Sequence, residues 1–103
     1  EVELAVEAKK QLNEKGIGVR IVSMPCTNIF NAQSAEYKES VLPKNITQRV
    51  SVEAGSTQGW YQYIGLEGKA IGLDRFGASA PYKTLYKEFG ITTEAVVEAV
   101  LGF

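Results

Sequence analysis

A glycine-rich turn between an apolar stretch and an aromatic cluster contains the residues best placed to bind a ligand. The four candidates for an anion-binding turn are Gly55, Ser56, Thr57 and Gly59. Backbone amides at the start of a helix can bind an anion. The turn lacks the lysine and hydroxyl residue with which a P-loop ends. The pattern is therefore typical of a plain tight turn, and anion binding by the turn is the alternative interpretation.

The side chains available for acid–base chemistry are few, because the 103 residues include no histidine. A serine–histidine–acid triad, a cysteine–histidine pair and a histidine-ligated metal are all excluded. Carboxylates, amines and phenols would need large pKa shifts to act near neutral pH. This is a poor inventory for an independent enzyme.

Cys26 is the only cysteine. An internal disulfide and a cysteine-built zinc site are excluded, which favours a reducing, cytoplasmic setting. At the N-terminus of a short helical turn, its thiol could be a thiolate, because that location lowers the pKa of a thiol. The commoner interpretation of a lone cysteine is a small, buried apolar residue.

Composition and charge indicate one small domain over residues 1–103. The hydrophobic fraction of 45% supports a modest core. A net charge of -1, from 11 basic and 12 acidic residues, argues against a nucleic-acid surface. No apolar run is long enough to cross a bilayer, so no membrane partner is expected.

The turn is positioned by the stretch Gln48 to Gly55, in which apolar and polar residues alternate as in a strand. The carboxyl end of a central parallel strand is where such sheets place ligands. Glu53 would repel phosphate there unless Arg49 or Arg75 compensates.

Helices and strands are expected to alternate around that strand. Helices are expected at residues 1–15, 34–42, 79–89 and 92–101, with further helical turns after Thr27 and Trp60, and strands at residues 17–24 and 69–72. Thr27, Ser34, Ser79 and Thr92 are the expected helix N-caps. This order predicts an α/β fold, a three-layer α/β/α sandwich with a mostly parallel (mixed) sheet. A helix at the very start normally follows a strand, so we expect an N-terminally truncated domain.

Five stretches, in order from end to end, resemble the C-terminal domain of bacterial-type transketolases. They are residues 1–5, Val22-Ser23-Met24-Pro25, residues 37–43, Val52-Glu53-Ala54-Gly55 ahead of Trp60, and residues 76–81 ahead of Phe89-Gly90. The family's domain carries a strand ending in a Gly-Ser pair directly ahead of the position of Glu1. This chain lacks both, so the resemblance implies an incomplete sheet.

The resemblance implies a parent enzyme that moves a two-carbon ketol unit from a ketose phosphate to an aldose phosphate, in the pentose phosphate pathway. Such enzymes are homodimers that use thiamine diphosphate and a divalent metal, magnesium or calcium, and their cofactor and catalytic histidines lie in two upstream domains. The resemblance thus implies that the cofactors and sugar phosphates are bound elsewhere, and that this chain contains no catalytic, cofactor-binding or metal-binding residue of the family. This domain would support packing on the upstream domains and dimer assembly, with Trp60, Phe76 and Tyr82 as candidate contacts.

Two alternatives stay open. Related thiamine-diphosphate enzymes, dihydroxyacetone synthase and deoxyxylulose phosphate synthase, end in a domain of the same architecture, although the quoted stretches favour transketolase. A regulatory module that binds a small anion at the carboxyl end of the sheet would use the turn at Gly55.

Overall fold

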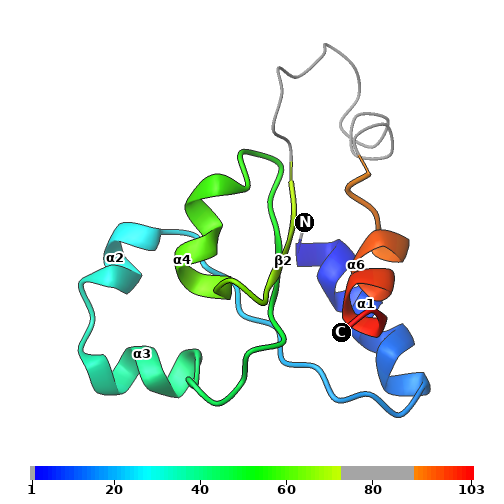
Figure 1. Ribbon diagram of the computed structural model, residues 1–103, viewed down its shortest axis with the longest axis horizontal. Coiled ribbons are helices and arrows are strands. Elements are labelled where there is room, and N and C mark those ends of the chain that lie inside the picture. Colours follow the sequence, from blue (N-terminus) through cyan, green and yellow to red (C-terminus); the bar gives the residue numbers. More distant parts are fainter. Residues whose placement is uncertain (1, 73–89) are drawn as a thin grey trace.

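The computed structural model describes residues 2–72 and 90–103 (Figure 1). Its elements are α1 (Val2–Glu14), α2 (Thr27–Asn31), α3 (Ala35–Val41), β1 (Val50–Val52), the 3-10 helix η1 (Gln58–Trp60), α4 (Tyr61–Ile64), β2 (Lys69–Ile71) and α6 (Thr93–Leu101). The helix expected at residues 79–89, Arg75, Phe76 and Tyr82 lie outside the described residues.

The two strands form a parallel pair, with Val50 opposite Lys69 and Val52 opposite Ile71. The pair is bounded by two further backbone hydrogen bonds. The Lys69 amide donates to the Arg49 carbonyl at 2.9 Å, and the Glu53 amide donates to the Ile71 carbonyl at 3.0 Å. The chain between the strands passes through η1 and α4, as a parallel connection requires.

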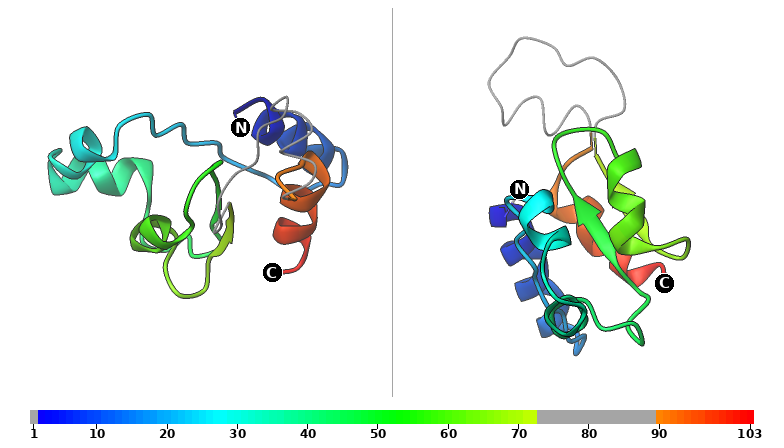
Figure 2. Two further views of the ribbon diagram at one scale, coloured as in Figure 1. Left: turned by 90° about the horizontal axis from the view of Figure 1, so that it is seen from above. Right: turned by 90° about the vertical axis from the view of Figure 1, so that its left-hand side faces the viewer.

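Helices cover both faces of this sheet, which confirms the predicted α/β class. Figures 1 and 2 show α1 and α6 side by side on one face and α4 on the other, with α2 and α3 further out. The core lies between α1, α6 and the sheet, and its buried residues are Ala8, Leu12, Val96 and Val97. Ala8 and Leu12 are four residues apart in α1, and the partly buried Val100 lies four residues after Val96 and three after Val97 in α6, so each helix turns one apolar stripe inward.

Helix ends follow local chemistry that the sequence predicts. Gly16, just past α1, adopts a φ of 81°, which favours glycine over any other residue. The Ser34 hydroxyl accepts a hydrogen bond from the Tyr37 amide at 3.1 Å, and the Thr92 hydroxyl accepts one from the Ala95 amide at 3.1 Å. Both residues are therefore N-caps, as expected.

The strand expected at residues 17–24 is not formed, so this prediction was wrong. The side chains of Ile17, Val19 and Ile21 are half-buried and alternate with exposed neighbours, as in a strand. Beyond Ile17, however, residues 18–25 make no backbone–backbone hydrogen bond to any described residue. An extended chain becomes a strand only beside a partner, and apolar alternation alone cannot supply one.

The N-cap expected at Thr27 is also corrected. Cys26 occupies the N-cap position of α2, with φ −141° and ψ 103°, and makes no side-chain cap hydrogen bond. Thr27 is already the first helical residue. A thiol is a weak hydrogen-bond acceptor, which explains why this five-residue helix begins without a side-chain cap.

Candidate functional site

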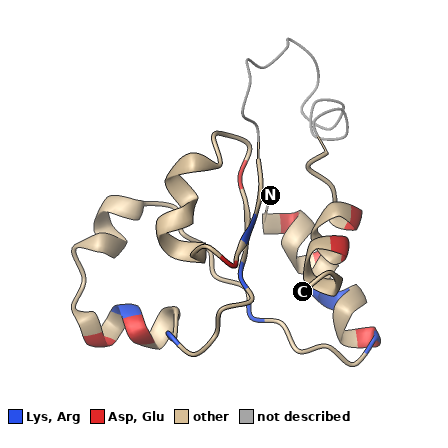
Figure 3. Ribbon diagram, in the orientation of Figure 1, with Lys and Arg blue, Asp and Glu red and all other residues tan. Residues whose placement is uncertain are grey.

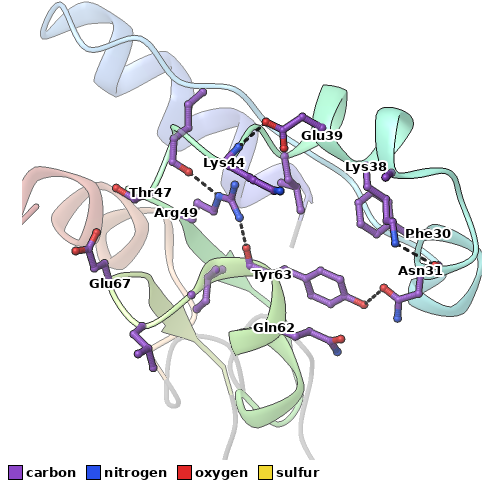
Figure 4. A pocket seen from close by; sticks show the side chains of 16 residues that line it. Phe30, Asn31, Lys38, Glu39, Lys44, Thr47, Arg49, Gln62, Tyr63 and Glu67 are labelled. Carbon is purple, nitrogen blue, oxygen red and sulfur yellow. Dashed lines mark hydrogen bonds between the residues drawn. The ribbon is translucent and has the colours of Figure 1, made fainter.

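A cavity of about 880 Å³ lies beside α2, α3 and α4 (Figure 4). Its walls come from these helices, from the loop that leads into β1 and from the turn between α4 and β2. Ten polar or aromatic residues on the walls are Phe30, Asn31, Lys38, Glu39, Lys44, Thr47, Arg49, Gln62, Tyr63 and Glu67. Amines, a guanidinium and carboxylates together could hold a polar ligand. Whether they are available to a ligand depends on the hydrogen bonds that each group already makes within the protein.

Arg49 is the most connected of these side chains. Its Nη1 donates to the Tyr63 carbonyl at 2.6 Å, and its Nη2 donates to the Pro43 carbonyl at 2.7 Å. Its Nε donates to the Ile46 carbonyl at 2.8 Å. The guanidinium thus ties the loop before β1 to α4, and its fork is used on backbone rather than presented to a ligand.

Tyr63 joins α4 to α2. Its hydroxyl donates to Asn31 Oδ1 at 3.0 Å. Its ring meets Phe30 edge-on at 5.9 Å between centroids and lies tilted against Trp60 at 5.6 Å. Such pairs contribute beyond their buried area. The aromatic cluster that the sequence places around Trp60 therefore includes a ring from α2.

The charged groups of the cavity mostly engage nearby backbone. Lys38 Nζ donates to the Asn31 carbonyl at 3.4 Å, and the Lys44 amide donates to Glu39 Oε1 at 3.0 Å. Figure 3 shows both signs of charge on α3. Among residues 2–72 and 90–103, no group of three or more His, Cys, Asp or Glu side chains could hold a metal ion.

The predicted anion-binding turn lies apart from this cavity, because none of Gly55, Ser56, Thr57 and Gly59 lines it. Within the turn, the Gln58 amide donates to Ser56 Oγ at 3.3 Å. The helical segment that follows comprises three residues of η1 and four of α4. Short helices concentrate little charge at their ends. Anion binding by this turn stays a prediction.

The remaining candidates are scattered. Trp60 is half-buried beside Tyr63, whereas Phe76 and Tyr82 lie outside the described residues, so the predicted contacts stay predictions. Cys26 is exposed, and its interpretation as a buried apolar residue is wrong. Arg49 is the residue whose role the sequence did not indicate, because the carbonyls that it binds come from two other segments.

The fold and this site define a small α/β domain whose polar residues mainly hold its own backbone. A family model described as the transketolase-like TK C-terminal domain matches residues 1–92. The chain belongs to this family.

Similar proteins support that assignment over nearly the whole chain. The chloroplastic transketolase of Solanum tuberosum is 60% identical over 99 residues, which are 96% of this chain and 13% of that protein. Transketolase 1 of Pasteurella multocida is 53% identical over 98 residues, 95% of this chain and 15% of that protein. The solved transketolase of Leishmania mexicana superposes with a TM-score of 0.87 at 46% identity, over 98% of this chain and 14% of that one. The chain thus spans about a seventh of these relatives.

Proposed function

We propose that this chain is the non-catalytic C-terminal domain of a transketolase. The parent enzyme would transfer a two-carbon ketol unit from a ketose phosphate to an aldose phosphate in the pentose phosphate pathway. The observation that carries the proposal is the family match over residues 1–92 together with 60% identity to a named transketolase. The similar proteins are named transketolases, which favours transketolase over dihydroxyacetone synthase or deoxyxylulose phosphate synthase.

The chemistry of the parent would take place outside this chain. Thiamine diphosphate, a divalent metal such as magnesium or calcium, and the sugar phosphates would be held by the upstream domains. The absence of histidine from the sequence supports this division, since the chain has no side chain that titrates near pH 7 without a large shift. The described residues also offer no cluster of metal ligands, so no step through the cofactor is assigned to them.

The role left for residues 1–103, as a single domain, is support of the parent's assembly. It would pack on the upstream domains and help to build a homodimer, with Trp60, Phe76 and Tyr82 as candidate contacts. Apolar side chains exposed on α2 and α3 support such packing, among them Ile29 at 63% and Tyr37 at 51% exposure.

The compartment proposed for the parent is the cytoplasm. The lone, exposed Cys26 suits a reducing setting. No helix in the described part of the chain is long and apolar enough to span a membrane. Several similar transketolases are named chloroplastic, so a plastid is the alternative.

The test is ketol transfer by three proteins, with thiamine diphosphate and magnesium present. They are the full parent, the parent lacking this domain, and the 103-residue chain alone. We expect transfer by the full parent and none by the isolated chain. Removing the domain is expected to lower the dimer fraction in sedimentation. Transfer by the isolated chain would overturn the non-catalytic assignment, and an unchanged dimer fraction would overturn the assembly role.

A further inference from the structure

Helices α2 and α3 project from the rest of the domain, as both views of Figure 2 show. Residues 26–42, named the arm, comprise these two helices, the turn between them and Cys26, the N-cap of α2. No residue of either helix is buried, and the large side chains of Ile29 and Tyr37 are exposed. The arm is therefore not attached to the domain through the core.

The two helices of the arm are bonded to each other. Lys38 Nζ in α3 donates to the Asn31 carbonyl in α2 at 3.4 Å. The Tyr37 ring in α3 lies tilted against the Phe30 ring in α2, with 6.4 Å between the centroids. In the turn between the helices, the Ser34 hydroxyl caps α3. These contacts favour movement of α2 and α3 together over movement of either helix alone.

The rest of the domain contacts the arm through one side chain at each helix. Arg20 Nη1 donates to the carbonyls of Ser40 and Val41 at the end of α3, at 3.2 and 3.4 Å. The Tyr63 hydroxyl donates to Asn31 Oδ1 at the end of α2, at 3.0 Å. The Arg20 contacts are exposed, where water competes for both partners, so each contact contributes only modestly to stability.

The arm also forms one wall of the cavity of about 880 Å³ (Figure 4). Phe30, Ala35 and Leu42 line the cavity from the arm, and Tyr63 and Ile64 line it from α4. A cavity between two elements replaces the close packing that otherwise holds them. A segment with few buried apolar contacts opens at a small cost in free energy.

The chain on either side of the arm allows rotation. Val19 packs against the core, so its neighbour Arg20 belongs to the rest of the domain. After Arg20, residues 21–25 make no backbone–backbone hydrogen bond to any described residue. At the other end, Leu42 has a φ of −124° and a ψ of 77°, and Pro43 follows, which has no amide to continue the helix. Hinges are typically a few such residues at the ends of elements.

We propose that the arm is a hinged lid on this cavity. The arm moves away from α4 as one unit, and the contacts of Arg20 and Tyr63 keep it closed. In the open state, the cavity is in contact with solvent along α4, and the facing rings of Phe30 and Tyr63 are exposed. Both contacts act on the same equilibrium, so the loss of either one releases both helices. The inference does not depend on ketol transfer.

The test is hydrogen exchange, followed residue by residue at low urea concentrations, on the 103-residue chain. The reporters are the hydrogen-bonded amides of Phe30 and Ala32 in α2, and of Lys38 and Leu42 at the start and end of α3. We expect all four to share one weak dependence on urea, because opening of the arm exposes the same small surface for each. The Leu12 amide of α1 should show a stronger dependence, because it exchanges through unfolding of the core.

Two single variants then test whether the helices move as one unit. Arg20→Ala removes a contact to α3 and should speed exchange of the Phe30 amide in α2 by about 5-fold, as for one lost hydrogen bond. Tyr63→Phe removes a contact to α2 and should speed exchange of the Leu42 amide by a similar factor. The double variant should reach about 25-fold at both amides, since the two sites do not touch.

Lys15→Ala is the matched control, because it removes one positive charge from an exposed residue beyond the end of α1. This variant should leave exchange in the arm unchanged. Acceleration confined to the helix that loses its own contact would overturn the proposal, since the helices would then open separately. A urea dependence of the arm amides equal to that of Leu12 would also overturn it, because the arm would then separate only when the core unfolds.

Discussion

The two sides of this domain are held together by different forces. On the α1–α6 side, defined by those two helices, Leu12 and Ala8 are almost fully buried against Val96 and Val97. On the α2–α3 side, defined by those two helices, no helical residue is buried. The second side is instead attached through the Arg49 guanidinium and the Tyr63 hydroxyl. Apolar burial thus stabilises one side, whereas polar contacts together with the ring contact between Phe30 and Tyr63 hold the other.

Both sides nevertheless expose large apolar side chains. Ile29 on α2 and Tyr37 on α3 are exposed, and so are Val2 and Val6 on α1 and Leu101 on α6. Apolar groups on either side would gain from contact with a neighbouring domain, so the proposed packing on upstream domains is compatible with both sides.

Leu12→Ala is expected to have the largest effect. Leu12 is 0% exposed, and its truncation leaves a cavity in the core, at a cost of about 3 kcal/mol in the free energy of unfolding. Leu42→Ala, the same change at a half-buried position after α3, is the matched comparison and should cost less than half as much. Urea unfolding measures both. Equal losses would contradict the division into two sides.

Arg49→Ala is expected to act next most strongly, on the α2–α3 side. The change leaves the carbonyls of Pro43 and Tyr63 without their charged donor, at a cost of about 2 kcal/mol in the free energy of unfolding. Arg49→Lys should recover little, because an amine has no planar fork. Hydrogen exchange should quicken in α4 before α1. Uniform acceleration through both sides would show that Arg49 supports the whole domain instead.

Tyr63→Phe isolates a single hydrogen bond between α4 and α2. The ring stays between Phe30 and Trp60, while the bond to Asn31 Oδ1 is lost, at a cost of about 1 kcal/mol. Tyr61→Phe, at a residue that is 46% exposed, is the control and should change stability by less than about 0.5 kcal/mol. Urea unfolding compares the two variants. An equal effect at Tyr61 would mean that the Asn31 contact contributes nothing measurable.

The features that local sequence predicts well are those whose partners lie a few residues away. The hydroxyls of Ser34 and Thr92 accept hydrogen bonds from the amides three residues further along the chain. The end of α1 at Gly16 depends on the φ angle of that one residue. The apolar stripes of α1 and α6 follow the helical period. These elements, and the α/β class that their order implies, were therefore predictable.

The features that the sequence did not reveal depend on distant partners. Alternation in residues 17–24 predicts which side chains turn inward, but pairing depends on a neighbouring strand. Arg49 binds carbonyls on Pro43 and Tyr63, and neither position carries a side-chain signal of that role. Candidate-site prediction was limited for the same reason, since a backbone carbonyl is available at every residue.

The smallest expected effect concerns the turn at Gly55, which belongs to neither side. A Cβ at Gly72 would lie 2.7 Å from the Gly55 carbonyl oxygen, so the end of β2 packs closely against this turn. Glu53 adds a carboxylate nearby, which opposes an anion. We therefore expect calorimetric titration with inorganic phosphate, and then with a sugar phosphate, to give no saturable heat. Saturable binding that weakens in Gly55→Val, but not in Gly18→Val, would instead establish a ligand site at this turn, outside both sides of the domain.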